Sequence, residues 1–298
     1  MTKNSEISAI KTNPVPGVKS YHFESFNLLV ITDGDVEYDN GCFAPGIPPA
    51  ELKQLRENHN NLTAHFMLPH NIMVFTSPDK TIMIDAGNGD KARPGAGKLA
   101  GNLYAAGIKP ADLTDIILTH AHPDHFSGLI SHSGQLVFPN AKIHLHQKEF
   151  DFWQDDHADF SKSKSLLSSL QSLQQEIQFF FTQISGKLQL FNTDEPLFDF
   201  LQPILTPGHT PGHCMFTIIS GNEKFIHMAD IFHDEIVLFA KPEWGTVFDI
   251  DFDLAARTRQ SILKEFATSK QRVFGYHLPW PGFGHIEKHN DAFTWVVE

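Results

Sequence analysis

The stretch THAHPDH, residues 119–125, gathers three histidines and one aspartate within six residues, directly after a short apolar run. Side chains two residues apart on an extended chain face the same way, so His120 and His122 can reach one metal ion. Asp124 and His125 would then turn toward a neighbouring ion. The alternative is a polar surface loop whose histidines have no function. The density of ligands favours a metal site where a buried strand ends.

Four further motifs accompany this loop: Asp85 in MIDAG, His209 in TPGHTPGH, Asp230 in HMAD and His277 in GYHLPWPGFGH. In type and order, the five motifs together resemble those of the metallo-β-lactamase superfamily. The resemblance runs from about Tyr21 to the C-terminus. It implies an α/β fold, an αββα four-layer sandwich of two mixed β-sheets flanked by helices.

The resemblance also implies two divalent metal ions, each held by three side chains, with Asp230 bridging them. Three neutral imidazoles suit zinc, and a shared carboxylate suits a close pair of ions. Iron, manganese or cobalt can use the same ligands. Asp85 is expected to support the metal loop without binding metal. The first ion is assigned to His120, His122 and His209, and the second to Asp124, His125 and His277.

Four residues beside these motifs are candidates for supporting or substrate-adjacent roles. His213 and His285 could orient ligands through hydrogen bonds or simply pack. His277 and His285 compete for one ligand position, and we favour His277 because it directly follows an apolar strand. His233 could hydrogen-bond substrate or orient the preceding aspartate. Trp280 is the aromatic residue expected near the cleft.

Two segments, IFH after Asp230 and the later HLPWPGFGHI, resemble the group that contains methyl parathion hydrolase and related lactone-cleaving enzymes. This implies a hydrolase in which a metal-bridged hydroxide attacks a lactone or ester, such as an acyl-homoserine lactone, or a phosphotriester. Asp124 or Asp230 is expected to handle the proton as the catalytic carboxylate. A glyoxalase-type thioesterase or a mononuclear iron persulfide dioxygenase would keep the same ligand order. A non-catalytic metal-binding or sensing module is the alternative from another class, and the full ligand set argues against it.

Composition narrows the partners and the compartment. Lys and Arg total 23 against 35 Asp and Glu, a net charge of −12 that repels nucleic acid and anionic lipid. The two cysteines, Cys42 and Cys214, are too few for a disulfide framework. No apolar stretch is long enough for a secretory signal or a membrane span. The sequence therefore predicts a cytoplasmic protein with a small apolar substrate and no nucleic-acid or membrane partner, and a homodimer is a reasonable expectation.

Residue patterning predicts a single domain. Residues 1–20 are polar and broken by prolines, so we expect a flexible arm before one domain at 21–298. A turn is expected at Asp33, where an apolar run meets Asp-Gly, and Asp253 is expected to cap a helix. The periodicity of about 150–183 predicts an amphipathic helical segment that covers the cleft.

Two apolar runs, 72–76 and 81–84, flank Ser-Pro-Asp-Lys. This arrangement is typical of a β-hairpin whose second strand ends beside Asp85. Another short strand is expected at 141–145, before the helical segment. Strands and helices therefore mix along both halves of the chain, as expected for one α/β domain.

Overall fold

The computed structural model describes residues 15–91, 93–290 and 292–298. Most of the expected arm, residues 1–14, lies outside the described residues. Its last part belongs to the domain, because strand β1 (Val18–His22) pairs antiparallel with the neighbouring strand and places Val18 opposite Ile31. The predicted boundary near residue 21 is therefore a few residues too late.

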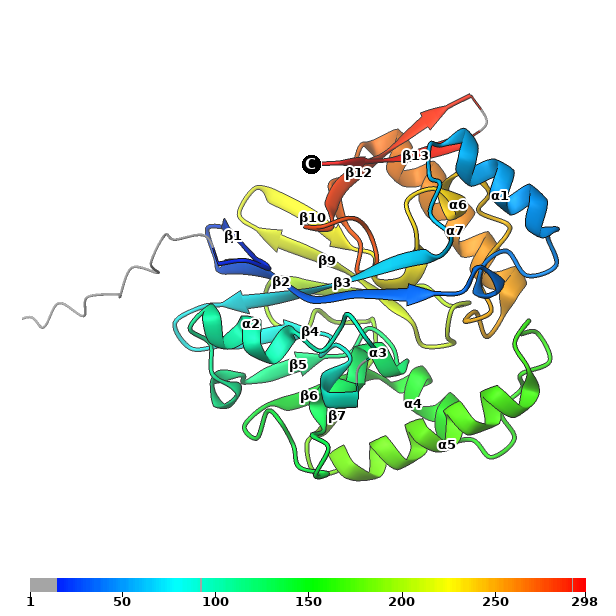
Figure 1. Cartoon of the computed structure of the whole chain (residues 1–298). Coiled ribbons are helices and arrows are strands. Elements are labelled where there is room, and N and C mark those ends of the chain that lie inside the picture. The colour runs from blue at the N-terminus through cyan, green and yellow to red at the C-terminus, as the bar shows by residue number, and fades with distance from the viewer. Residues whose placement is uncertain (1–14, 92, 291) are drawn as a thin grey trace, which may run out of the picture.

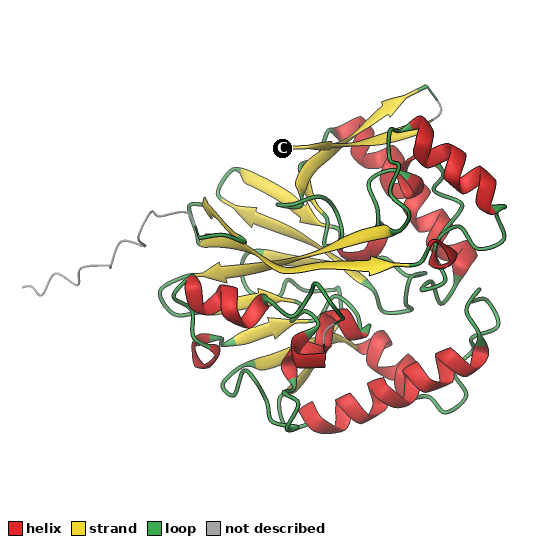
Figure 2. Ribbon diagram, viewed as in Figure 1, coloured by secondary structure: helices red, strands yellow, loops and turns green. Residues whose placement is uncertain are grey.

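Two mixed β-sheets form the centre of the molecule, and helices cover their outer faces (Figures 1 and 2). This confirms the predicted αββα sandwich. The first sheet is seven-stranded in chain order, and its strands after β1 are β2 (Asn27–Tyr38), β3 (Phe66–Thr76), β4 (Thr81–Ile84), β5 (Asp115–Ile117), β6 (Lys142–His146) and β7 (Leu188–Phe191). The second sheet is six-stranded in the order β13-β12-β11-β10-β9-β8, from β8 (Leu201–Leu205), β9 (Cys214–Ser220), β10 (Glu223–His227), β11 (Val273–Phe274), β12 (Phe283–His289) and β13 (Ala292–Val297).

The helices lie between and after these strands. None of the helices in the described part of the chain is both long and apolar enough to cross a membrane. The α-helices are α1 (Pro49–Asn58), α2 (Leu99–Ala105), α3 (Pro123–Phe126), α4 (Gln147–Gln154), α5 (Leu167–Ile184), α6 (Val237–Ala240) and α7 (Phe252–Ser269). The 3-10 turns are η1 (Asn40–Cys42), η2 (Gly89–Lys91), η3 (Pro110–Asp112), η4 (Ser127–Leu129) and η5 (Ala229–Ile231).

The run LLVI at 28–31 shows how the sequence builds this sandwich. Successive side chains of a strand point to opposite faces, so both faces of β2 are apolar. Leu28 and Val30 enter the core between the two sheets, where they meet residues such as Phe216. Leu29 and Ile31 enter the core between the first sheet and its helices. A sheet built from strands that are buried on both faces can therefore form one of the two inner layers of a four-layer fold.

The expected turn at Asp33 is instead a β-bulge. Strand β2 continues to Tyr38, and its register against β3 shifts between Thr32 and Gly34. The Asp33 carboxylate is buried and accepts hydrogen bonds from the backbone N–H of Leu99 at 2.8 Å and of Asn88 at 2.9 Å. The Asp-Gly pair is typical of a turn, but a bulge also accommodates the extra residue and its positive-φ glycine.

The expected helical segment is two helices, α4 and α5, joined by an irregular loop. Helix α7 begins earlier than expected, because the carboxylate of Asp251, rather than that of Asp253, accepts the hydrogen bond from Leu254 N–H. The hairpin of β3 and β4 forms as predicted, with Thr76 opposite Thr81.

Candidate metal centre

The candidate ligands lie in loops at the carboxyl ends of strands from both sheets. Backbone conformation divides the THAHPDH loop into two halves. His122 is extended, with φ −84° and ψ 150°, and Pro123 is the first residue of the short helix α3. Asp124 and His125 therefore lie on a helical turn while His122 lies on extended chain, so the two parts of the loop face different positions.

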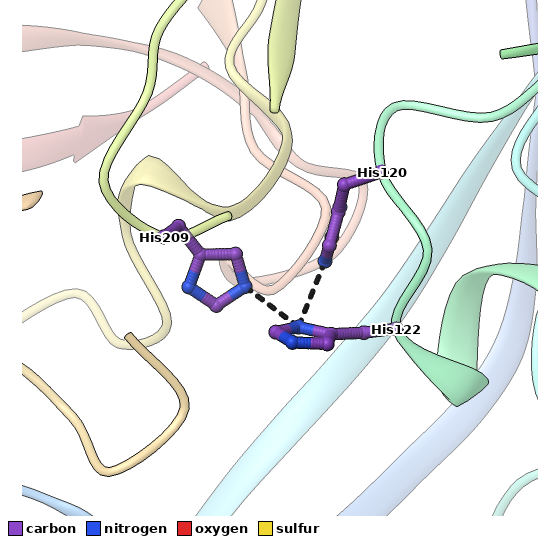
Figure 3. Close-up of side chains that lie close together, drawn as sticks. All are labelled: His120, His122 and His209. Carbon is purple, nitrogen blue, oxygen red and sulfur yellow. Dashed lines mark hydrogen bonds between the residues drawn. The ribbon is translucent and has the colours of Figure 1, made fainter. Parts of the chain in front are cut away.

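Three histidine nitrogens converge at one point (Figure 3). His122 Nδ1 lies 3.0 Å from His120 Nε2 and 2.9 Å from His209 Nε2. The other ring nitrogen of His209, Nδ1, lies 2.9 Å from Asp249 Oδ1, a carboxylate oxygen that can only accept a hydrogen bond. His209 therefore carries its proton on Nδ1 and directs a lone pair from Nε2 toward the other rings. This arrangement suits one cation and is unfavourable without one.

Burial lowers the pKa of both His120 and His122 well below the usual histidine range, and the neighbouring imidazoles lower it further. Both rings are therefore neutral, as metal ligands must be.

A second group contains Asp124, His125, Asp230 and His277, whose ligand atoms lie within 4.8 Å of one another. His125 Nε2 and His277 Nε2 each lie 3.2 Å from Asp230 Oδ2. Their opposite nitrogens are engaged elsewhere: His125 Nδ1 lies 2.8 Å from Asp85 Oδ2, and His277 Nδ1 donates to the Pro69 carbonyl at 2.9 Å. These outer contacts fix the orientation of the two rings, so both direct Nε2 toward the group.

Asp230 touches both groups. Besides its two contacts in the second group, Oδ2 lies 3.6 Å from His209 Nε2 and 3.8 Å from His120 Nε2. Its other oxygen, Oδ1, is buried and has no hydrogen-bond partner among the described residues. A buried carboxylate oxygen without a donor is costly unless a cation satisfies it. The residues present therefore fit two divalent ions that share this carboxylate.

In the protein without metal ions, the positive and negative charges of the second group balance. Burial by itself would lower the pKa of His277, but Asp230 and Asp124 offset it and raise that pKa to about 9. Burial would likewise lower the pKa of His125, yet its neighbouring carboxylates raise it well above the usual range. Two protonated imidazoles thus face two carboxylates whose own pKa values are depressed.

The structure brings three of the expected supporting residues to the ligands. Asp85 is fully buried and accepts the backbone N–H of Thr119 at 2.8 Å, in addition to its contact with His125. His213 Nε2 accepts the backbone N–H of Asp230 at 3.1 Å. His233 Nε2 lies 3.3 Å from Asp230 Oδ2.

Two other expected residues lie elsewhere. His285 belongs to β12, where its Nε2 lies 3.3 Å from Glu287 Oε1, and its side chain is 37% exposed. Trp280 is 39% exposed and is not among the described residues that line the cavity beside the ligands. The chain leaves the site after His277 and turns back into β12. Trp280 and His285 are therefore close to His277 in sequence but do not lie beside the ligands.

Several contacts of the ligands were not expected from the sequence. His70 on β3 is fully buried with Nε2 3.3 Å from Asp124 Oδ2, and Tyr276 donates its hydroxyl to the Asp124 carbonyl at 2.7 Å. Asp249, the partner of His209, is itself held by Arg259 at 3.4 Å. His70, Asp249 and Arg259 stand outside the motifs that carry the ligands, so no local signal identifies them. Tyr276 precedes His277 in GYHLPWPGFGH, but its position there gives no sign of a contact with Asp124.

A cavity of about 360 Å³ opens onto the second group. His122, Asp124, Asp230, His233 and His277 line one side of it. The rest of the lining is mostly apolar. Its apolar and aromatic members are Tyr38, Leu68, Pro123, Leu170, Leu173, Val247 and Phe248, and its polar members are Asn88, Arg93, Ser165 and Ser169.

The first turns of α5 supply part of this apolar wall through Leu170 and Leu173, so the helix lies beside the cleft. A larger cavity of about 520 Å³ lies beside α1, and none of the clustered ligands lines it. The smaller cavity is therefore the candidate for substrate, because it combines an apolar wall with convergent polar groups.

The loop after Asp230 contains a buried carboxylate, Asp234, that should make the stability of the protein depend on pH. Asp234 Oδ1 accepts the backbone N–H groups of Ile236 and Val237 at the start of α6. Burial, and then the charge of Glu235, raise the pKa of Asp234 to about 7. Because an unfolded aspartate titrates near about 3.9, the folded state binds the extra proton between these values, and stability falls as pH rises from about 4 to about 7.

Asp234→Asn keeps the acceptor and removes the charge. We expect this variant to be more stable than the wild type at pH 8, with the difference shrinking toward pH 5. Urea unfolding of both proteins at the two pH values measures it. A stability difference that does not change with pH would contradict the raised pKa.

The family model described as the metallo-beta-lactamase superfamily matches residues 66–277. No curated protein sequence gives a significant match. The solved structure of AidC, a dizinc quorum-quenching lactonase in complex with the product N-hexanoyl-L-homoserine, is 36% identical, with a TM-score of 0.89 and coverage of 95% of this chain and 97% of that one.

Two further solved structures are similar. The hydrolase AbOPH of the beta-lactamase superfamily is 25% identical, with a TM-score of 0.86 and coverage of 96% of this chain and 99% of that one. A probable metal-dependent hydrolase from Staphylococcus aureus is 20% identical, with a TM-score of 0.71 and coverage of 93% and 99%, which shows the likeness of fold alone.

Proposed function

The chain belongs to the metallo-β-lactamase superfamily, and on that premise we propose that it is a dinuclear metal-dependent hydrolase that opens lactone rings, with N-acyl-homoserine lactones as the substrate class. One observation carries this proposal: Asp230 belongs to one ligand group and lies within 3.8 Å of the other, beside a cavity whose remaining lining is largely apolar. The 36% identity to a dizinc lactonase over 95% of the chain supports it.

We assign the two metal positions from the ligand groups. His120, His122 and His209 would hold one ion, Asp124, His125 and His277 the other, and Asp230 both. Zinc is proposed because five imidazoles dominate the set, and because the similar lactonase contains two zinc ions. Bound there, the ions would polarise the ester carbonyl and activate a water molecule.

Two cavity-lining side chains are placed to serve the reacting ester. The carboxylate of Asp124 is 17% exposed, so one side reaches the cavity while His70 and His277 contact its Oδ2. It can accept the proton released when water attacks and return it to the ring oxygen, which leaves as an alcohol. His233 also lines the cavity, where its imidazole can hydrogen-bond the substrate.

The apolar wall is suited to the acyl chain. Leu68, Leu170, Leu173 and Phe248 contribute side chains without charge to the cavity. Burying each methylene of a substrate chain contributes about 0.8 kcal/mol. We therefore expect KM to fall as the acyl chain lengthens from C4, until the cavity is filled.

The test combines metal analysis with substrate comparison. Purified protein is examined by elemental mass spectrometry and assayed with C4 to C12 acyl-homoserine lactones, paraoxon and a glutathione thioester. We expect two zinc ions per chain and a kcat/KM for the best lactone at least about 100-fold above those of the other two substrates, a difference of about 2.8 kcal/mol in transition-state binding.

Four results would overturn the assignment. Paraoxon as the best substrate would identify a phosphotriesterase, and the thioester as the best substrate would identify a glyoxalase-type enzyme. One iron ion per chain with glutathione-dependent oxygen consumption would identify a dioxygenase. Two bound metal ions without any hydrolysis would favour a sensing module.

A further inference from the structure

We propose that Glu149 is a positioning residue that holds the three-histidine group in register by joining the loop of His120 and His122 to the loop of His209. The inference rests on the two-metal site proposed above and adds a residue that contacts neither metal position. Glu149 lies on α4, and its side chain is fully buried.

Four hydrogen bonds fill the acceptor positions of this carboxylate. Oε1 accepts the backbone N–H of Ala121 at 2.9 Å and the indole N–H of Trp153 at 2.8 Å. Oε2 accepts the hydroxyl of Thr210 at 2.6 Å and the backbone N–H of Gly212 at 2.8 Å. A carboxylate with two donors on each oxygen is fixed in both position and rotation.

The partners of Glu149 are chain neighbours of the three ligands. Ala121 lies between His120 and His122, and Thr210 directly follows His209. The first loop follows β5 of the seven-stranded sheet, whereas the second joins β8 to β9 of the six-stranded sheet. The carboxylate therefore bridges two loops that belong to different sheets.

The spacing between these loops sets the metal group. The 2.9 Å separation of His122 Nδ1 from His209 Nε2 spans 87 residues of sequence, so it depends on how the loops sit against each other. The packing under Glu149 is tight, because a Cβ on Gly212 would lie 2.2 Å from the Glu149 backbone nitrogen. A shift of either loop would therefore separate the ligand nitrogens.

Helix α4, which carries Glu149, is tied to α5 by hydrogen bonds. Trp153, the partner of Glu149 on α4, accepts hydrogen bonds at its carbonyl from the side chains of Gln178 at 3.0 Å and Gln174 at 3.3 Å, both on α5. Helix α5 therefore restrains α4, and α4 restrains the two loops.

Burial disfavours the charge of a carboxylate, and a well-packed apolar side chain in its place often makes the protein more stable. A carboxylate at this position therefore indicates a role beyond packing. The second metal group has its own carboxylate, Asp85, which contacts His125. In the first group Asp249 contacts His209, and none of the four hydrogen-bond donors to Glu149 is a ligand of the second group. This division predicts that loss of Glu149 weakens one metal position and spares the other.

The experiment measures zinc affinity rather than turnover. Metal-free wild type and Glu149→Gln are titrated with zinc against a chromophoric chelator that resolves two dissociation constants per chain. The amide introduced by this substitution turns a donor toward two existing donors, so we expect one constant to rise about 10- to 100-fold while the other stays within about twofold.

A matched pair tests the bond without changing Glu149. Thr210→Val removes the hydroxyl donor at nearly constant volume. We expect it to raise the same zinc dissociation constant that Glu149→Gln raises. Thr210→Ser keeps the donor and should restore the wild-type constant. This pair also decides the question if Glu149→Gln does not fold.

Asp115→Asn is the control for general destabilisation. Asp115 is another buried carboxylate, bound by Lys80 at 3.0 Å and His144 at 2.9 Å, and it lies at the opposite end of β5 from the metal loop. We expect both zinc constants of this variant to match the wild type.

Two results separate the possible failures. Wild-type constants in Glu149→Gln and Thr210→Val would overturn the positioning role while leaving the two-metal site intact. Fewer than two zinc ions bound by the wild type would instead overturn the proposed function.

Discussion

Asp230→Asn is expected to lower kcat/KM by at least about 10³-fold and to leave fewer than two metal ions per chain. Asp230 Oδ2 is the atom that approaches both ligand groups, and Oδ1 is the buried oxygen without a partner among the described residues. Asparagine has the same shape, but it lacks the charge that balances two cations. Its amide would also turn a donor toward the imidazole nitrogens of His125 or His277.

Turnover of an acyl-homoserine lactone and metal content by elemental mass spectrometry measure this effect. Asp115→Asn is the matched control, since it makes the same chemical change at a buried carboxylate far from the ligands. We expect the control to keep two metal ions and wild-type turnover. Full activity with two ions in Asp230→Asn would refute the shared-carboxylate scheme.

Asp85→Asn is expected to lower the free energy of unfolding of the metal-free protein by about 3 kcal/mol. The Asp85 carboxylate is fully buried and receives Thr119 N–H, the Thr119 hydroxyl and the His125 ring within 3.0 Å. Its backbone has φ +62°, a left-handed conformation that asparagine tolerates as well as aspartate does. The substitution therefore removes the charge without adding backbone strain.

The same change should disturb His125 as a ligand. An amide N–H beside His125 Nδ1 favours the tautomer that carries its proton on Nε2, which then cannot present a lone pair. We expect affinity for the second metal ion to fall about 10- to 100-fold. Urea unfolding of chelator-treated protein and zinc titration measure the two effects.

Asp85→Ala separates backbone strain from the loss of hydrogen bonds, because alanine is disfavoured at this positive φ. We expect Asp85→Ala to be less stable than Asp85→Asn. If Asp85→Asn unfolds within about 0.5 kcal/mol of the wild type, the size of a neutral surface substitution, then Asp85 does not stabilise the loop.

Local patterns predicted the strands that end beside Asp85 and before the THAHPDH loop. The two apolar runs around Ser-Pro-Asp-Lys form the β3–β4 hairpin, and the apolar run before THAHPDH forms β5. Where one residue pattern is typical of two kinds of local structure, the prediction was wrong. Asp33 with Gly34 suits a turn or a bulge equally well in sequence, and only pairing along the whole length of β3 selects the bulge.

His285 shows the same limit at the site. It stands eight residues after His277 in one glycine-rich motif, and sequence alone left the two in competition. The fold separates them, because β12 pairs with β13 and carries His285 toward Glu287. Strand pairing, which depends on residues far along the chain, decides which imidazole reaches the cluster.

The sequence by itself determined the fold class, the family and the candidate ligands, because metal ligands come in short motifs at the ends of strands and a motif is a local property. Only the tertiary structure decided what holds those ligands. Asp249 lies 40 residues from His209, and Glu149 lies 28 residues from Ala121. A single acidic residue has no local signature, so its role appears only when folding brings it against the chain it supports.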